Sequence, residues 1–161
     1  MNSAKTKTNT QKLRGARLCA VQALYQIDLT GKAGKKVVSE FIDHRITDNA
    51  QSEDKIYADG EFFQELVKEA VENHIMVDAQ ISSRLVKGWT LERIDPIVRA
   101  ALRLATYELM NKLQTPIAVI IDEYVGVVAA FHEGKEPNFV NGILERIAKE
   151  TKADLARVAP E

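Results

Sequence analysis

The fold is decided by the stretch LERIDPIVRAALRLATYELMNKL, residues 91–113, which predicts a long helix that is apolar on nearly every side. Asp95 can cap its start, and Pro96 supplies a preset φ at the first helical position. The apolar residues that follow occupy most sectors of a 3.6-residue helix: Ile97, Val98, Ala101, Leu102, Leu104, Ala105, Leu109 and Met110. A helix of this kind is buried by neighbours on most sides. The stretch therefore predicts the centre of a helical bundle.

A narrow polar stripe interrupts this apolar surface. Arg99, Arg103 and Thr106 form it, at the helical spacing i, i+4 and i+7. Two interpretations stay open. The arginines either form a solvated seam or salt bridges at the edge of the bundle, or they face a partner.

The rest of the chain also follows helical spacing. Further helices are predicted over residues 11–29, 36–46, 59–74, 77–86, 116–131 and 138–149. No alternation of period two predicts a strand, and Trp89 is expected to anchor the turn over residues 87–90 against the core. The predicted fold is all-α: a compact single-domain bundle of about seven helices over residues 11–150. Residues 1–10 are expected to form a flexible basic tail, and residues 151–161 a C-terminal tail.

Charge is distributed unevenly along the 161 residues, although the net charge is only −1. The first 27 residues hold five basic side chains and no acidic one, whereas the remainder carries 17 basic and 23 acidic side chains. This asymmetry indicates a localised anion-binding surface. The lone cysteine, Cys19, excludes an internal disulfide and a cysteine-cluster metal site. No signal peptide or membrane-spanning run is visible, so a soluble cytoplasmic protein is expected.

The sequence offers no pattern for catalysis. Phosphate-binding glycine loops and the common hydrolase motifs are absent. Glu40 and His44 stand at i, i+4, but one such pair is common on helix surfaces and does not predict a metal. Asp122 and Glu123 are adjacent, so on a helix they point about 100° apart and do not make an acid–base pair. We predict no enzyme activity, no metal and no cofactor.

Two groups of residues are candidates for binding RNA. Lys12, Arg14 and Arg17 lie within two turns and can neutralise phosphates, although a solvated helix start is the competing interpretation. Phe139 and Asn141, in EPNFVNG, can stack on an unpaired base and hydrogen-bond to it. The competing interpretation for Phe139 is plain core packing.

Four segments in series resemble the NusB family of transcription antitermination factors. They are ARLCAVQALYQIDL (16–29), KGWTLERIDPIVRAALRLATYEL (87–109), TPIAVIIDEYVGVVAAF (115–131) and NFVNGILERIA (138–148). The resemblance covers about residues 13–148 and implies two packed helical subdomains without catalytic activity. It also implies binding to the boxA element of ribosomal RNA leader transcripts, together with NusE, a small-subunit ribosomal protein. The complex, with other Nus factors on the elongating polymerase, would suppress termination.

The resemblance also implies roles for individual residues. Lys12, Arg14 and Arg17 would contact phosphates, and Phe139 and Asn141 would lie near the RNA. A region facing NusE or a second copy of the chain is expected at Tyr25 and along the exposed side of the central helix, at Val98, Arg99, Leu102 and Arg103. Reversing the charge of both Arg14 and Arg17 is expected to weaken RNA binding with the fold intact.

Two other functions fit the helical pattern less well. The chain could be the N-terminal RNA-binding domain of a ribosomal RNA cytosine methyltransferase, or a helical adaptor that binds only protein. The first needs a cofactor-binding fold and a nucleophile, and neither is visible in this sequence. Charge reversal at the start of the first helix tests the second.

Overall fold

A computed structural model describes the backbone of residues 2–112 and 114–158, and the side chains of residues 8–112 and 114–151. Seven α-helices account for most of this described part, so the prediction of an all-α fold is confirmed. The chain divides after Glu72 into two compact units, which are described separately below.

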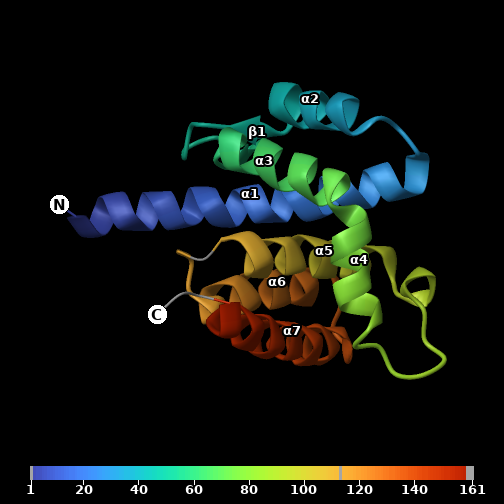
Figure 1. Cartoon of the computed structure of the whole chain (residues 1–161). Coiled ribbons are helices and arrows are strands. Elements are labelled where there is room, and N and C mark those ends of the chain that lie inside the picture. Colours follow the sequence, from blue (N-terminus) through green and yellow to red (C-terminus); the bar gives the residue numbers. More distant parts are fainter. Residues whose placement is uncertain (1, 113, 159–161) are drawn as a thin grey trace. The chain divides into compact units, whose positions relative to one another are not determined.

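The first unit holds three helices and a small sheet. Its elements are α1 (Asn2–Thr30), α2 (Gly34–His44), β1 (Ile46–Thr47), β2 (Ile56–Tyr57) and α3 (Gly60–Glu72). Helix α1 packs against both α2 and α3, which lie on the same side of it (Figure 1). Gly31 follows α1 with a φ of 70°, as expected for a glycine that ends a helix. The core of the unit includes Phe41 and Phe63, whose stacked ring centroids lie 5.5 Å apart.

The two strands correct the expectation of a chain without strands. They pair in parallel, with Ile46 opposite Ile56 and Thr47 opposite Tyr57. Each is two residues long, which is too short to produce a recognisable alternation in the sequence. Helix α1 also begins at Asn2 rather than near residue 11. The side chains of Lys5 and Lys7, in the predicted basic tail, lie outside the described residues.

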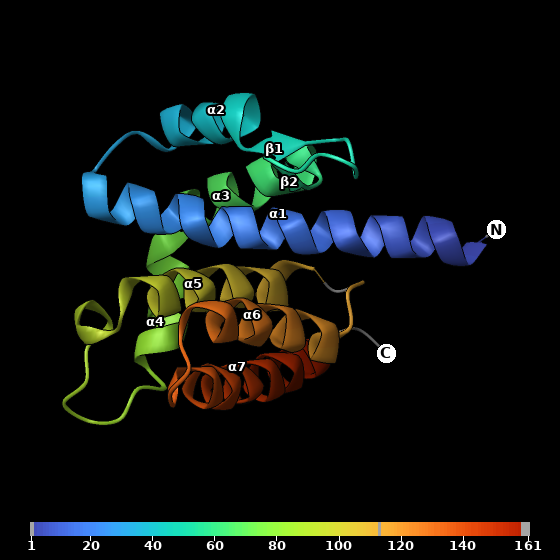
Figure 2. The same ribbon diagram turned by 180° about the vertical axis from the view of Figure 1, so that it is seen from behind.

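The second unit contains the predicted central helix. Its elements are α4 (His74–Ser82), the 3-10 turn η1 (Leu91–Arg93), α5 (Pro96–Asn111), α6 (Ile117–Phe131) and α7 (Glu136–Val158). Helices α5, α6 and α7 lie side by side and pack against one another, and α4 packs against α5 (Figure 2). The predicted cap is confirmed, because Oδ1 of Asp95 accepts hydrogen bonds from the backbone N–H groups of Ile97 and Val98 at 2.9 and 3.2 Å.

The boundaries in this unit differ from the predicted ones. The central helix starts at Pro96, because residues 91–93 form the separate 3-10 turn. Its last predicted residue, Leu113, lies outside the described residues. The backbone of α7 stays helical to Val158, so the predicted C-terminal tail begins inside a helix. Trp89 does not anchor its turn in the core, since 56% of its surface is exposed.

The lone cysteine leads to a test of stability against pH. Burial raises the pKa of the Cys19 thiol from 9.0 to about 12. Above pH 9 the unfolded chain therefore loses this proton while the folded chain keeps it. This contribution to the free energy of unfolding is intact below pH 9 and is expected to fall by about 1.4 kcal/mol per pH unit from about pH 9 to 12. Urea unfolding of the wild type and of Cys19→Ala measures it. Equal pH slopes for the two chains would contradict the assignment.

The described residues hold neither a membrane-spanning helix nor a cluster of metal-ligating side chains. No helix there has both the length and the apolarity that crossing a membrane requires. No group of three or more histidine, cysteine, aspartate or glutamate side chains there is arranged to hold a metal ion.

Candidate nucleic-acid interface

Lys12 and Arg14 lie on the accessible surface of α1 in the first unit. Arg14 is exposed and Lys12 is half-buried. The Lys12 ammonium forms an ion pair with Asp48 in the loop between the strands, and it lies 5.5 Å from the centroid of the Tyr57 ring. Hydrogen bonding to Asp48 raises the pKa of Lys12 above its ordinary value. Lys12 is therefore a cation that already has a carboxylate neighbour, which the sequence alone did not indicate.

Arg17 has a different environment from Arg14. Only 4% of its surface is exposed, and its guanidinium carbon lies 5.2 Å from the centroid of the Phe62 ring in α3. A guanidinium over an aromatic face makes a favourable cation–π contact. Arg17 thus contributes to the packing of α1 on α3, and its charge is largely withdrawn from the surface.

The arginines of α5 make intramolecular contacts. Arg103 forms a two-pronged ion pair with Asp78 of α4, with Nε–Oδ1 and Nη2–Oδ2 distances of 2.8 and 3.0 Å. Nη1 of Arg99 donates to the backbone carbonyls of Leu91 and Ile94 at 3.2 and 3.1 Å. The salt-bridge interpretation of the stripe is confirmed for Arg103.

Several residues expected to face a partner are not at the surface. Val98 is 1% exposed and Leu102 is fully buried, so the side of α5 that carries them is not an exposed side. Thr106, the third member of the polar stripe, is also fully buried. Tyr25 is half-buried on α1. The expectation that Val98 and Leu102 face a partner is therefore wrong for the free chain, because both side chains belong to the core.

Phe139 and Asn141 lie on the first turns of α7 in the second unit. Phe139 is 37% exposed, so the interpretation of plain core packing is wrong for this residue. Asn141 is half-buried, and its Nδ2 donates to Oε1 of Glu145, one turn further along, at 3.3 Å. The two side chains therefore have different surroundings. The ring of Phe139 is partly open to solvent, whereas the amide of Asn141 is hydrogen-bonded within its own helix.

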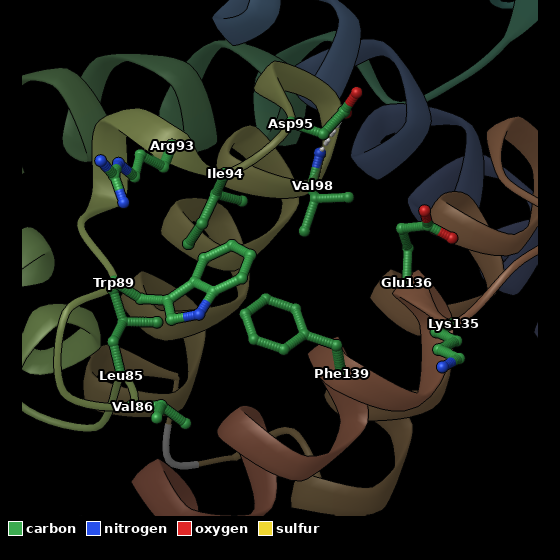
Figure 3. Close-up of a pocket in the computed structure, with 10 residues that line it drawn as sticks. All are labelled: Leu85, Val86, Trp89, Arg93, Ile94, Asp95, Val98, Lys135, Glu136 and Phe139. Carbon is green, nitrogen blue, oxygen red and sulfur yellow. Dashed lines mark hydrogen bonds between the residues drawn. The ribbon is translucent and has the colours of Figure 1, made fainter.

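Phe139 lines a surface groove of about 470 Å³ that we call the Trp89 groove. The loop after α4, the 3-10 turn, the start of α5 and the start of α7 form its walls. Ten residues line it: Leu85, Val86, Trp89, Arg93, Ile94, Asp95, Val98, Lys135, Glu136 and Phe139. Figure 3 shows the Trp89 and Phe139 rings pointing toward one another inside it. The sequence predicts that Trp89 packs in the core, but its place in the polar turn KGWT is a signal for an exposed position.

The profile of the NusB family matches residues 14–149 of the chain. The chain belongs to the NusB family. The transcription antitermination protein NusB of Caulobacter vibrioides is 42% identical over 137 residues, which cover 85% of this chain and 92% of that protein.

Two solved structures are similar to the chain along most of its length. One is T. maritima NusB, with a TM-score of 0.72 and 33% identity over 85% of this chain and 90% of that one. The other is a NusB in a structure of the antitermination factors NusB and NusE with double-stranded RNA. It has a TM-score of 0.69 and 28% identity, and covers 85% of this chain and 96% of that one. The similarity therefore spans both compact units of the NusB-family chain.

The candidate RNA-binding residues belong to different units. Lys12 and Arg14 lie in the first unit, and Phe139 and Asn141 in the second. Of the four, the two basic residues offer charge for phosphates, and Phe139 offers an aromatic face for a base.

Proposed function

We propose that the chain is a non-enzymatic antitermination factor that binds boxA-type single-stranded RNA of ribosomal RNA leader transcripts together with NusE. In this complex, with other Nus factors on the cytoplasmic elongation complex, it keeps RNA polymerase from terminating. The observation that carries the proposal is the 42% identity to an antitermination protein over 92% of that protein's length. The similar structure that combines a NusB with NusE and RNA supports both partners.

The charge distribution agrees with two different partners. The exposed Arg14 and the nearby Lys12 suit phosphates, whereas the acidic excess outside the first 27 residues suits a basic ribosomal protein. Neither alternative function gains support: the relatives reported above are antitermination proteins and not methyltransferases. A protein-only adaptor would not need the exposed Arg14 of α1.

The direct test is fluorescence anisotropy of a labelled boxA-type RNA, with and without NusE, over a series of salt concentrations. We expect tighter binding in the presence of NusE, and the logarithm of the affinity should fall linearly with the logarithm of the salt concentration. No binding under either condition would favour the protein-only adaptor. Sedimentation of the free chain shows whether it is a monomer or a homodimer.

Arg14→Glu is the variant that tests the phosphate contact. Because Arg14 is exposed, the fold should tolerate the change, and RNA affinity should fall across different RNA sequences. The slope of log affinity against log salt should decrease in magnitude by about one phosphate contact, roughly 0.7 for a single strand. Anisotropy at several salt concentrations measures both quantities.

Lys36→Glu is the matched control, since Lys36 is an exposed lysine of α2 in the same unit and the charge change is identical. It should alter the long-range attraction to RNA slightly and leave the salt slope close to that of the wild type. Equal losses for the two variants would mean that only net charge matters, and the proposed contact at Arg14 would then be wrong.

A further inference from the structure

The small sheet of the first unit lies against the part of α1 that carries Lys12 (Figure 2). The backbone carbonyl of Lys12 accepts a hydrogen bond from the N–H group of Asp59, directly after β2, at 3.0 Å. One turn further along α1, Gly15 lies so close to the carbonyl oxygen of Tyr57 that a side chain would not fit between them. Helix and sheet therefore meet backbone to backbone, and this contact does not depend on the charge of Lys12.

The pairing of the two strands also fixes the position of Asp48, the residue that follows β1. The N–H group of Ala58 donates to the carbonyl of Thr47 at 3.2 Å, and the N–H group of Asn49 donates to Oγ1 of Thr47 at 3.1 Å. Asp48 stands between these two anchored neighbours, and its carboxylate forms the ion pair with the Lys12 ammonium. The sheet thus holds a negative charge directly against a cation of α1.

The ion pair between Lys12 and Asp48 is open to solvent. The Asp48 side chain is 87% exposed and the Lys12 side chain 28%. Within the described part of the chain, Lys12 is the only partner of the Asp48 carboxylate. Exposed ion pairs of this kind contribute little to stability, and another anion can replace one partner. A phosphate that approaches Lys12 therefore meets a like charge that already occupies it.

We propose that Asp48 is an intramolecular competitor of RNA: it occupies Lys12 in the free chain, and an RNA phosphate takes its place on binding. The proposal rests on the RNA binding proposed above and adds a residue that opposes it. Binding at this point exchanges one ion pair for another, so Lys12 contributes less to the affinity than an unoccupied lysine would. The effect applies to RNA of any sequence, because phosphates carry no base information.

Asp48→Asn in the full chain tests the competition, since asparagine keeps the size of the side chain and removes its charge. Anisotropy of a labelled boxA-type RNA should show an affinity roughly 1.5- to 5-fold higher than that of the wild type at low salt. The gain should shrink as salt screens the charges. The slope of log affinity against log salt should therefore become steeper, by less than the roughly 0.7 of a full phosphate contact. A scrambled RNA of equal length should gain by the same factor.

Two controls separate the ion pair from net charge. Asp43→Asn makes the same charge change at an exposed position of α2 in the same unit, and it should raise the affinity only slightly. In a chain that also carries Lys12→Gln, Asp48→Asn should give no more gain than Asp43→Asn, because the competed cation is gone. Asp43 and Asp48 are both exposed, so the melting temperatures of the two single variants should stay close to that of the wild type.

The outcomes distinguish failure of the competition from failure of RNA binding itself. Weaker RNA binding by Asp48→Asn would overturn the proposal and show that Asp48 positions Lys12 for the phosphate. Equal affinities of Asp48→Asn and Asp43→Asn, or a gain that persists with Lys12→Gln, would also overturn it. Each of these results leaves the antitermination function standing. No RNA binding by the wild type, with or without NusE, would overturn both proposals.

Discussion

Arg17→Glu is expected to lower the free energy of unfolding of the first unit by about 3–5 kcal/mol, the loss typical of a buried charge deprived of its partner interactions. Arg17 is 4% exposed, and its guanidinium lies over the Phe62 ring. A glutamate there would place a carboxylate in a site built for a cation and an aromatic face, with little water to solvate it. Urea unfolding followed by far-ultraviolet circular dichroism measures the loss.

The burial of Arg17 changes what is expected when Arg14 and Arg17 are reversed together, since the double variant should no longer keep the fold intact. Arg14→Glu alone provides the control, since the same charge change at an exposed position one turn away should cost less than about 0.5 kcal/mol. Arg17→Met, which keeps the apolar stem without the charge, should fall between the two. An unfolding midpoint for Arg17→Glu equal to that of Arg14→Glu would show that Arg17 does not stabilise the first unit.

Gly15→Ala is expected to destabilise the first unit although alanine is the better helix former. A Cβ atom at Gly15 would lie 2.1 Å from the backbone carbonyl oxygen of Tyr57 and 3.1 Å from Cβ of Ala58. Backbone atoms cannot turn aside as a flexible side chain can, so α1 and β2 would have to separate. Overpacking of this kind costs about 1–3 kcal/mol or more, which outweighs the gain of about 1 kcal/mol in helix propensity.

Gly142→Ala is the matched substitution with the opposite expected sign. Gly142 is exposed inside α7, and a Cβ atom there would meet no atom within 4 Å. The helix should therefore gain up to about 1 kcal/mol, because nothing offsets the propensity of alanine. Thermal unfolding of the two variants gives the comparison. Stabilisation by both would mean that β2 can move away from α1 at little cost.

Much of the fold could be predicted because the apolar spacing and the capping residues of a helix lie within one short stretch of sequence. The apolar spacing of residues 97–110 and the cap at Asp95 lie within one stretch, and the predicted cap hydrogen bonds form. The two strands could not be predicted in this way. Each consists of only two residues, and what makes them strands is the partner across the loop, which no local pattern contains.

The candidate site was predictable only in part. Phe139 was identified as a candidate from its motif, but its neighbour Trp89 was assigned to the core, since a large apolar side chain is usually buried. Val98 and Leu102 were placed on an exposed side, although they are buried. A helical pattern gives the angle between side chains on one helix, but it does not say which angle faces a neighbour.

The all-α class, the main helices, the cap of α5 and membership of the NusB family could all be predicted from the amino-acid sequence, because local spacing and ordered motifs carry that information. The burial of Arg17 over Phe62 and the ion pair of Arg103 with Asp78 became visible only in the folded chain. The folded chain also shows that there is no room for a side chain at Gly15, because the backbone of Tyr57 lies against it. The physical reason is the same each time: burial, ion pairing and close approach depend on atoms brought from distant parts of the chain.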